Sequence, residues 1–127
     1  MKRFTPVAAA LSVGIVIGAG GVGLVKAQDA KKPAYVVAEV EVTDPAAFQA
    51  YVAKVPDTLK PFNARTLVRG KAEGKEGDAP KGGIVVLAFD SMADAEKWYA
   101  SPAYVPLIAE RQKAAKSRVY FVEGVAP

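Results

Sequence analysis

The chain has 127 residues with neither cysteine nor histidine, and 17 Lys and Arg against 13 Asp and Glu give a formal net charge of +4. This length allows one domain at most. The missing residue types exclude disulfides, Ser-His and Cys-His nucleophile systems and His-ligated metals. No stripe of Lys and Arg interleaved with aromatic residues is present, so nucleic-acid binding is not predicted.

The N-terminal segment has the features of an export signal. Two basic residues precede an uncharged apolar run over residues 4–25, and Val25 and Ala27 supply the small residues of a cleavage site. Residues 1–27 are therefore predicted to be a cleaved signal peptide, which makes the mature protein periplasmic or secreted. The alternative is an uncleaved membrane anchor, because the run is about long enough to span a bilayer. Without residues 1–27, fourteen of the 17 bases and all 13 acids remain, so the net charge falls to +1.

A short leader over residues 28–33 is predicted to be flexible, and the first strand is predicted over residues 34–42. Alternate positions of this strand share a face. One face is wholly apolar (Val36, Ala38, Val40, Val42) and the other is mixed (Tyr35, Val37, Glu39, Glu41). The apolar face is expected to carry the helices.

The first helix is predicted to begin at Pro45, with Asp44 as its N-cap. Four apolar residues follow at helical spacing (Phe48, Tyr51, Val52, Val55). Pro56 is predicted to interrupt this helix, because proline lacks the amide hydrogen that the helix needs. Asn63 is expected to end the following turn in a left-handed conformation.

The middle of the chain predicts two strands joined by a loop. Residues 65–70 form a short polar strand of the kind found at a sheet edge. Residues 71–83 are rich in glycine and charge and predict a surface loop. Residues 84–89 are continuously apolar and largely β-branched, which is typical of a central strand.

Two further helical segments and a strand complete the chain. Ser91 is the predicted N-cap of the first segment, with Asp94 three residues later, and Ala95, Trp98 and Tyr99 then share one helical face. The next segment is predicted to start near Pro106 and to place Leu107, Ile108 and Arg111 on one face. Residues 118–124 predict the last strand.

The order strand, helix, strand, strand, helix, strand predicts an α+β, ferredoxin-like domain over residues 34–127, with a four-stranded antiparallel sheet. Its helices would cover one face of the sheet. The other face, with Tyr35, Val37, Leu67 and either Val86 or Phe89, would leave a large apolar patch on a monomer. A homodimer that buries this patch is therefore predicted.

The same residues, taken in order, resemble the domain of unknown function 1330 family of the dimeric α/β-barrel superfamily. The resemblance covers residues 35–125 and is carried by Thr43-Asp44-Pro45 with Phe48 and Tyr51, by Phe62 with Arg65, Leu67, Val68, Arg69 and Gly70, by Phe89, Ser91, Ala95, Trp98, Tyr99, Ser101, Pro102 and Tyr104, by Arg111, and by Glu123-Gly124. It implies a homodimer whose two sheets face each other as a barrel, with a small pocket between each sheet and its helices or partner. It implies no established reaction.

The chain departs from this family pattern in two places. Many members have a glycine before the basic residue of the second strand, where this chain has Asn63-Ala64. Several members of the superfamily use a catalytic histidine, and this chain has none. The second departure lowers the expectation of an enzyme.

Glu39 and Arg69 are the first candidate site residues. A partly desolvated Glu39 would have a raised pKa and serve as a general base, and so is the candidate catalytic residue; an ion pair or a solvated rim is the alternative. Arg69 is a candidate clamp for a carboxylate, unless it pairs with Glu39, Glu41 or the partner subunit. If Val68 faces the helices, Arg69 faces the barrel. The family's strand order implies two strand spacings, roughly 10 Å, between the two strands, which would let Glu39 and Arg69 form one polar centre directly or through a ligand carboxylate.

Tyr35, Trp98 and Tyr104 are predicted to edge this pocket, with Arg111 at its mouth, although core and dimer packing explain these residues as well.

Two candidate functions follow from these residues. The first is a small-molecule-binding module for a small anionic ligand, without turnover. The alternative is a cofactor-independent enzyme, of isomerase, lyase or monooxygenase type, acting on a small acidic or enolisable metabolite. No cofactor is expected, and no metal, because carboxylates alone would have to ligate it.

Overall fold

The computed structural model describes residues 32–127, so the predicted signal peptide and most of the predicted leader lie outside the described residues. The described elements are β1 (Ala34–Val42), α3 (Pro45–Leu59), the short 3-10 helix η1 (Lys60–Phe62), β2 (Arg65–Lys71), β3 (Gly83–Phe89), α4 (Met92–Tyr99), α5 (Val105–Ala114) and β4 (Ala115–Glu123). Among these helices, none is long and apolar enough to cross a membrane.

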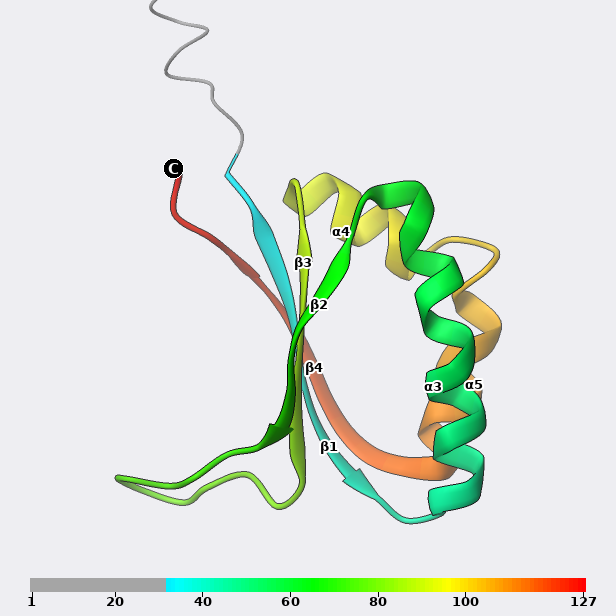
Figure 1. Cartoon of the computed structure of the whole chain (residues 1–127), viewed down its shortest axis with the longest axis vertical. Helices are drawn as coiled ribbons and strands as arrows, with labels where there is room; N and C mark the ends of the chain where they lie inside the picture. The colour runs from blue at the N-terminus through cyan, green and yellow to red at the C-terminus, as the bar shows by residue number, and fades with distance from the viewer. Residues whose placement is uncertain (1–31) are drawn as a thin grey trace, which may run out of the picture. The chain divides into compact units, whose positions relative to one another are not determined.

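The four described strands form one antiparallel sheet in the order β2-β3-β1-β4. The described α-helices α3, α4 and α5 lie on one face of this sheet, and the loop between β2 and β3 extends away on the other side (Figure 1). The predicted α+β, ferredoxin-like fold is confirmed. The order also confirms that β1 and β2 lie two strand spacings apart, with β3 between them.

The core lies between the sheet and the helices, as the alternation of β1 predicts. Val36 and Val40 are buried on the helix face, and Val36 is paired with Leu87 of β3 and Phe121 of β4. Trp98 of α4 is the largest fully buried side chain and packs against Phe89 with 5.3 Å between ring centroids. Of the two residues considered for the uncovered face, Phe89 therefore belongs to the core.

Both predicted N-caps are present. The Asp44 side chain accepts a hydrogen bond of 3.1 Å from the amide of Ala47, and the Ser91 side chain accepts one of 3.1 Å from the amide of Asp94. Each cap satisfies an amide that has no partner within its helix. The two caps fix the residues at which α3 and α4 begin.

Pro56 does not interrupt α3, so that prediction is wrong. The helix runs through Pro56 to Leu59, and Asn63 then takes the left-handed conformation, with φ of 52°. A proline inside a helix costs about 3 kcal/mol. Val55 and Leu59 flank it and are both buried in the core, and burying one such side chain contributes about 1.5–3 kcal/mol. Packing therefore offsets the lost hydrogen bond.

A β-bulge in β2 reverses the facing predicted for that strand. Thr66 is paired with Leu87, but Val68 is paired with Val86, so Leu67 is the extra residue. One extra residue moves every later side chain to the opposite face. The prediction that Val68 faces the helices and Arg69 faces away from them is therefore wrong: Arg69 lies opposite Val85, on the helix face.

The last strand starts earlier than the sequence predicts, at Ala115. Ala114 and Ala115 are buried, and the Ala114 carbonyl accepts hydrogen bonds from the amides of Thr43 and Asp44. These contacts tie the end of α5 to the end of β1. The chain consequently enters β4 directly from the helix.

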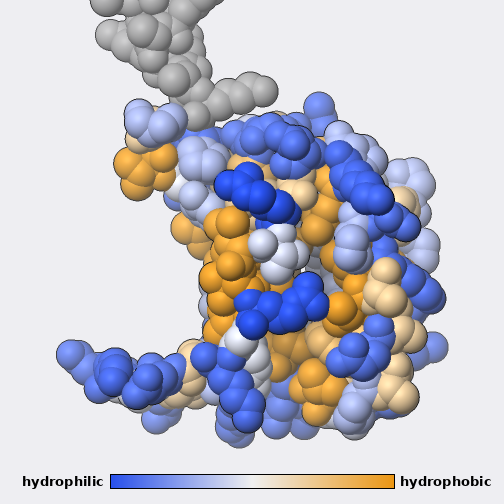
Figure 2. Space-filling view, viewed as in Figure 1, coloured by the Kyte–Doolittle hydropathy of each residue, from blue (hydrophilic) through white to orange (hydrophobic). Residues whose placement is uncertain are grey.

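The face of the sheet opposite the helices is uncovered and largely apolar. Strand residues with exposed apolar side chains include Leu67, Val68, Tyr120 and Val122, and hydrophobic atoms are visible along this side of the sheet in Figure 2. Alternation also places Tyr35, Val37 and Glu39 on this face. It matches the apolar patch predicted from the sequence.

Candidate functional site

A pocket of about 80 Å³ lies between the sheet and the helices. Apolar side chains of β1, β3 and β4 form one wall, and aromatic side chains of α3, α4 and the connection to α5 form the other. Figure 2 shows this hydrophobic hollow, with hydrophilic side chains at its opening. One water needs on the order of 10–15 Å³, so the pocket has room for a small organic molecule.

The aromatic wall is held by hydrogen bonds between buried side chains. The hydroxyls of Tyr51 and Tyr104 lie 2.7 Å apart, and the Trp98 indole N–H donates to the Thr58 hydroxyl at 2.9 Å. Tyr51 and Thr58 are seven residues apart in α3 and so lie on the same side of that helix. Trp98 and Tyr104 also stack, with ring centroids 4.0 Å apart. These contacts fix the rings that line the pocket.

Burial raises the pKa of Tyr51 far above its ordinary value, and the neighbouring Tyr104 phenol raises the pKa further. The Tyr51 phenol is therefore neutral throughout the physiological range. It is able to donate a hydrogen bond to a ligand. It is not a general base.

Arg111 is the buried charge of the site. Its side chain comes from α5, is 5% exposed, and donates from a terminal nitrogen to the Tyr99 hydroxyl at 3.4 Å. Its Nε has no hydrogen-bond partner, and no carboxylate pairs with it among residues 32–127. Burial lowers the pKa of Arg111, but hydrogen bonding and proximity to Tyr104 outweigh this and raise the pKa above its ordinary value. The guanidinium therefore stays charged.

Arg69 lines the same pocket from the sheet side. It belongs to edge strand β2, is exposed, and makes no ion pair within the described part of the chain. The structure thus brings together four of the six predicted site residues: Arg69, Trp98, Tyr104 and Arg111. Their roles in binding a ligand stay predictions.

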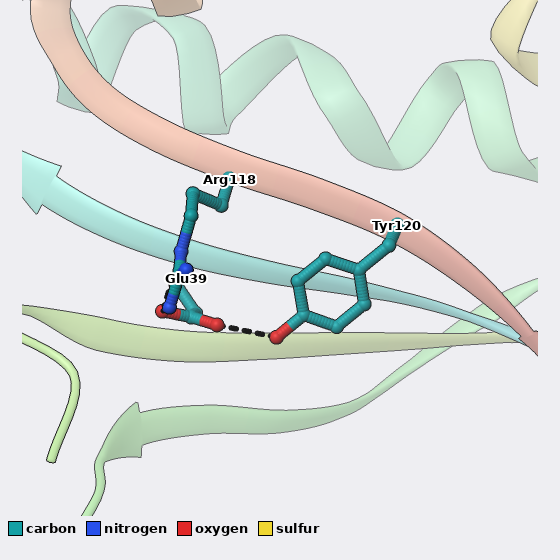
Figure 3. Close-up of polar contacts among 3 residues, drawn as sticks. All are labelled: Glu39, Arg118 and Tyr120. Atoms are coloured by element: carbon teal, nitrogen blue, oxygen red, sulfur yellow. Dashed lines mark hydrogen bonds and ion pairs between the residues drawn. The ribbon is translucent and has the colours of Figure 1, made fainter. Parts of the chain in front are cut away.

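Glu39 lies on the other face of the sheet and does not meet Arg69. Its carboxylate accepts hydrogen bonds from Arg118 Nε at 3.1 Å and from a terminal nitrogen of Arg118 at 2.6 Å, and it also accepts one from the Tyr120 hydroxyl (Figure 3). The predicted Glu39–Arg69 centre is wrong for two reasons. The bulge turns Arg69 to the helix face, and β4 places Arg118 directly opposite Glu39.

The pKa of Glu39 is also shifted in the direction opposite to the one predicted. The hydrogen bond from Tyr120, and then that from Arg118, hold the pKa below its ordinary value. Both bonds stabilise the ionised carboxylate more than the protonated acid. The raised pKa expected of a general base is therefore absent, and the alternative of an ion pair is the one observed.

Tyr35 also lies outside the pocket. Its cross-strand neighbours are Ala88 and Val122, on the uncovered face. Its ring packs close to Gly124, where an added Cβ would lie 2.7 Å from a ring carbon. Tyr35 therefore lies on the same face as Glu39, as the alternation of β1 predicts, and apart from the pocket that Trp98 and Tyr104 line; its role in binding stays a prediction.

Two pocket residues, Tyr51 and Tyr99, are not among the six predicted site residues and were expected mainly as helix core positions. Both line the pocket, and Tyr99 accepts the hydrogen bond from Arg111. Their helical spacing is the same as that of ordinary core residues. The available signal was the residue type, because a buried tyrosine needs a partner for its hydroxyl.

Metal ligands are not gathered in the described residues. No group of three or more Asp or Glu side chains is close enough there to hold a metal ion. None of the residues that line the pocket is Asp or Glu. The chemistry that the site offers is therefore that of two guanidinium groups and several phenols beside an apolar chamber.

Solved structures share this fold at low sequence identity. A protein of unknown function from Rhodopseudomonas palustris matches with a TM-score of 0.62 and 16% identity, over 85% of this chain and 94% of that one. The cofactor-independent oxygenase SnoaB from Streptomyces nogalater matches with a TM-score of 0.54 and 12% identity, over 77% of this chain and 97% of that one. A dimeric ferredoxin-like protein of unknown function from Thermobifida fusca matches with a TM-score of 0.51 and 13% identity, over 73% of this chain and 92% of that one.

No curated protein matches the sequence. The similar solved structures establish the ferredoxin-like fold and no activity, because they share so few residues with this chain. The sequence model of one family, Domain of unknown function (DUF1330), matches residues 33–125. The chain therefore belongs to the DUF1330 family.

Proposed function

We propose that this protein binds a small organic anion without turnover, in the pocket between the sheet and the helices. The observation that carries the proposal is the buried Arg111, which faces no carboxylate among residues 32–127. A buried charge without a partner costs several kcal/mol of stability. An anionic ligand would supply the missing partner, because its oxygens would accept hydrogen bonds from the Arg111 guanidinium that lines the pocket.

The ionisable groups of the pocket support binding more than catalysis. Its lining contains two arginines and three tyrosines, with neither Asp nor Glu. Tyr51 stays protonated, so it does not abstract protons near neutral pH. A general base would have to come from the ligand or from outside the pocket lining.

A cofactor-independent enzyme, of isomerase, lyase or monooxygenase type, is the second candidate function. A cation beside an apolar chamber is suited to stabilising an enolate formed from a small acidic or enolisable metabolite. The likeness of the fold to a cofactor-independent oxygenase is consistent with this role. The missing base in the pocket lining places this candidate second.

A homodimer is proposed through the uncovered face of the sheet. Two of the similar structures are described as dimeric with a ferredoxin-like fold. Burial of apolar residues such as Val68 and Val122 would favour association. Glu39 would tolerate burial in such an interface, because Arg118 and Tyr120 already satisfy its carboxylate.

Export from the cytoplasm is proposed on the N-terminal segment alone. Its basic start, apolar run and small residues at positions 25 and 27 occur in the order of a signal peptide. N-terminal sequencing of the protein recovered outside the cytoplasm tests this. A start at Gln28 supports cleavage, whereas recovery of Met1 in the membrane fraction supports the anchored alternative.

The binding proposal is tested by incubating the purified protein with a metabolite extract and identifying retained compounds by mass spectrometry. We expect retention of an organic acid that is returned unchanged, and loss of that retention in Arg111→Met. A compound returned in altered form would establish the enzyme instead. Retention that is equal in Arg111→Met and the original protein would contradict a binding role for Arg111.

A further inference from the structure

We infer that the ligand is a compact dicarboxylate, with one acid group on Arg111 and the other on Arg69. This inference rests on the proposed binding of an organic anion and names its chemical class. Its basis is the charge of the pocket lining together with the positions of the two arginines on opposite walls.

The pocket lining carries two positive charges and no negative one. Arg69 and Arg111 are its basic residues, and it contains neither Asp nor Glu. Neither arginine forms an ion pair within the described residues. One monocarboxylate would leave the second guanidinium of the lining without an anion. Two carboxylates match the charge of the lining.

The two guanidinium groups come from different walls, which favours two separate acid groups. Arg111 extends from α5 and is buried, whereas Arg69 extends from edge strand β2 and is exposed. Arg111 is thus placed for the inner end of a ligand and Arg69 for the end near solvent. A single phosphate also carries up to two charges, but it concentrates them at one point.

The β-bulge adds an independent observation. It is the insertion of Leu67 that turns Arg69 toward the helices, because an unbroken alternation would turn it to the other face. Bulges commonly re-aim a side chain next to a site. Here the consequence is that a second cation reaches the pocket that contains Arg111.

The sheet wall of the pocket indicates the spacer between the acid groups. The side chains of β1 and β3 that line the pocket are apolar, including Val36, Val85 and Leu87. These side chains offer no hydrogen bonds, so a hydroxyl group on the part of the spacer that packs against them would be desolvated without a partner. The spacer is therefore a short hydrocarbon chain or ring.

The test measures binding of matched acids by calorimetry at low ionic strength. Pentanoate is compared with glutarate and hexanoate with adipate, so that each pair differs in one added acid group at equal carbon number. Phenyl phosphate tests a dianion whose charge is concentrated at one end. We expect each dicarboxylate to bind at least about tenfold more tightly than the monocarboxylate of equal carbon number. Phenyl phosphate should show no such advantage over the monocarboxylates.

Two variants test whether Arg69 causes the preference for dicarboxylates. Arg69→Gln is expected to reduce dicarboxylate affinity to the level of the monocarboxylate. Arg65→Gln is the matched control, because Arg65 lies on the same strand but pairs with Ala88 on the uncovered face. It should keep the full preference. Sedimentation of both variants shows whether either change alters assembly.

The outcomes separate this inference from the proposed function. Equal binding of the two members of each pair, lost in Arg111→Met, would overturn the dicarboxylate and leave the proposed function standing. Tighter binding of phenyl phosphate than of glutarate and adipate would also overturn the dicarboxylate. A preference that survives Arg69→Gln would overturn the role of Arg69. Binding of none of these acids at about 10 mM would overturn the inference and count against the proposed function as well.

Discussion

The hydroxyls of Tyr51 and Tyr104 share a buried hydrogen bond of 2.7 Å across 53 positions of the chain. This bond joins α3 to the turn that precedes α5, and the ring of Tyr104 stacks on Trp98. Arg111 sits beside these phenols and lines the same pocket. The aromatic wall therefore packs the core and also holds the one buried cation of the described residues.

Arg111→Met should stabilise the protein and abolish anion binding. An apolar side chain of similar length removes an unpaired buried charge, so the free energy of unfolding should rise by about 1–2 kcal/mol. In a domain of this size that raises Tm by about 4–8 °C per kcal/mol. Thermal unfolding measures this rise in Tm. Lys113→Met, at an exposed position of the same helix, is the control and should change neither property. A clear loss of stability in Arg111→Met would show that Arg111 is structural.

Tyr51→Phe should destabilise the protein by about 1 kcal/mol. The change removes one hydroxyl from a buried hydrogen-bonded pair and leaves the Tyr104 hydroxyl without that partner. Denaturant unfolding measures the loss, and the double variant with Tyr104→Phe should cost less than the sum of the two single changes. Tyr35→Phe serves as the control, on the uncovered face. Additive effects at Tyr51 and Tyr104 would mean that the bond contributes nothing of its own.

The stability of the protein should fall in acid partly through Glu39. Because its folded pKa lies below the ordinary value, Glu39 contributes stability that is present above the unfolded pKa and is lost as pH falls through the folded one. The pH window in which this stability is lost therefore begins at about pH 4 and extends below it. Glu39→Gln should flatten the profile of Tm against pH in this window. Glu41→Gln, on the same strand but exposed, should leave the profile as it is. Identical slopes for the Glu39 variant and the original protein would exclude this linkage.

Val122→Asp should dissociate the proposed homodimer. Val122 is 47% exposed on the uncovered sheet face, and a charge there would be buried by a second copy. Sedimentation should show a shift from dimer to folded monomer. Val105→Asp is the matched control, because Val105 is 49% exposed but lies at the start of α5. Dissociation by both substitutions, or by neither, would argue against the uncovered face as the interface.

The sequence by itself determined the architecture, because the signals for the described elements are local. Alternation identified the buried face of β1, and the residue types of Asp44 and Ser91 located the starts of α3 and α4. The order of the elements then specified the ferredoxin-like sheet. Pro56 was the exception, since its helix-breaking tendency is also local but is offset by burial of Val55 and Leu59, which depends on the whole core.

The candidate site was decided by tertiary structure. A single bulge residue, Leu67, determines which face Arg69 occupies, and nothing in the pattern of residues 65–70 distinguishes a bulged strand from a regular one. Likewise, Glu39 pairs with Arg118 because β4 is its neighbour in the sheet, 79 positions away in the chain. Local patterns specify which residues share a face of one element. Which charges meet depends on strand register and on contacts between distant segments, and these exist only once the sheet has formed.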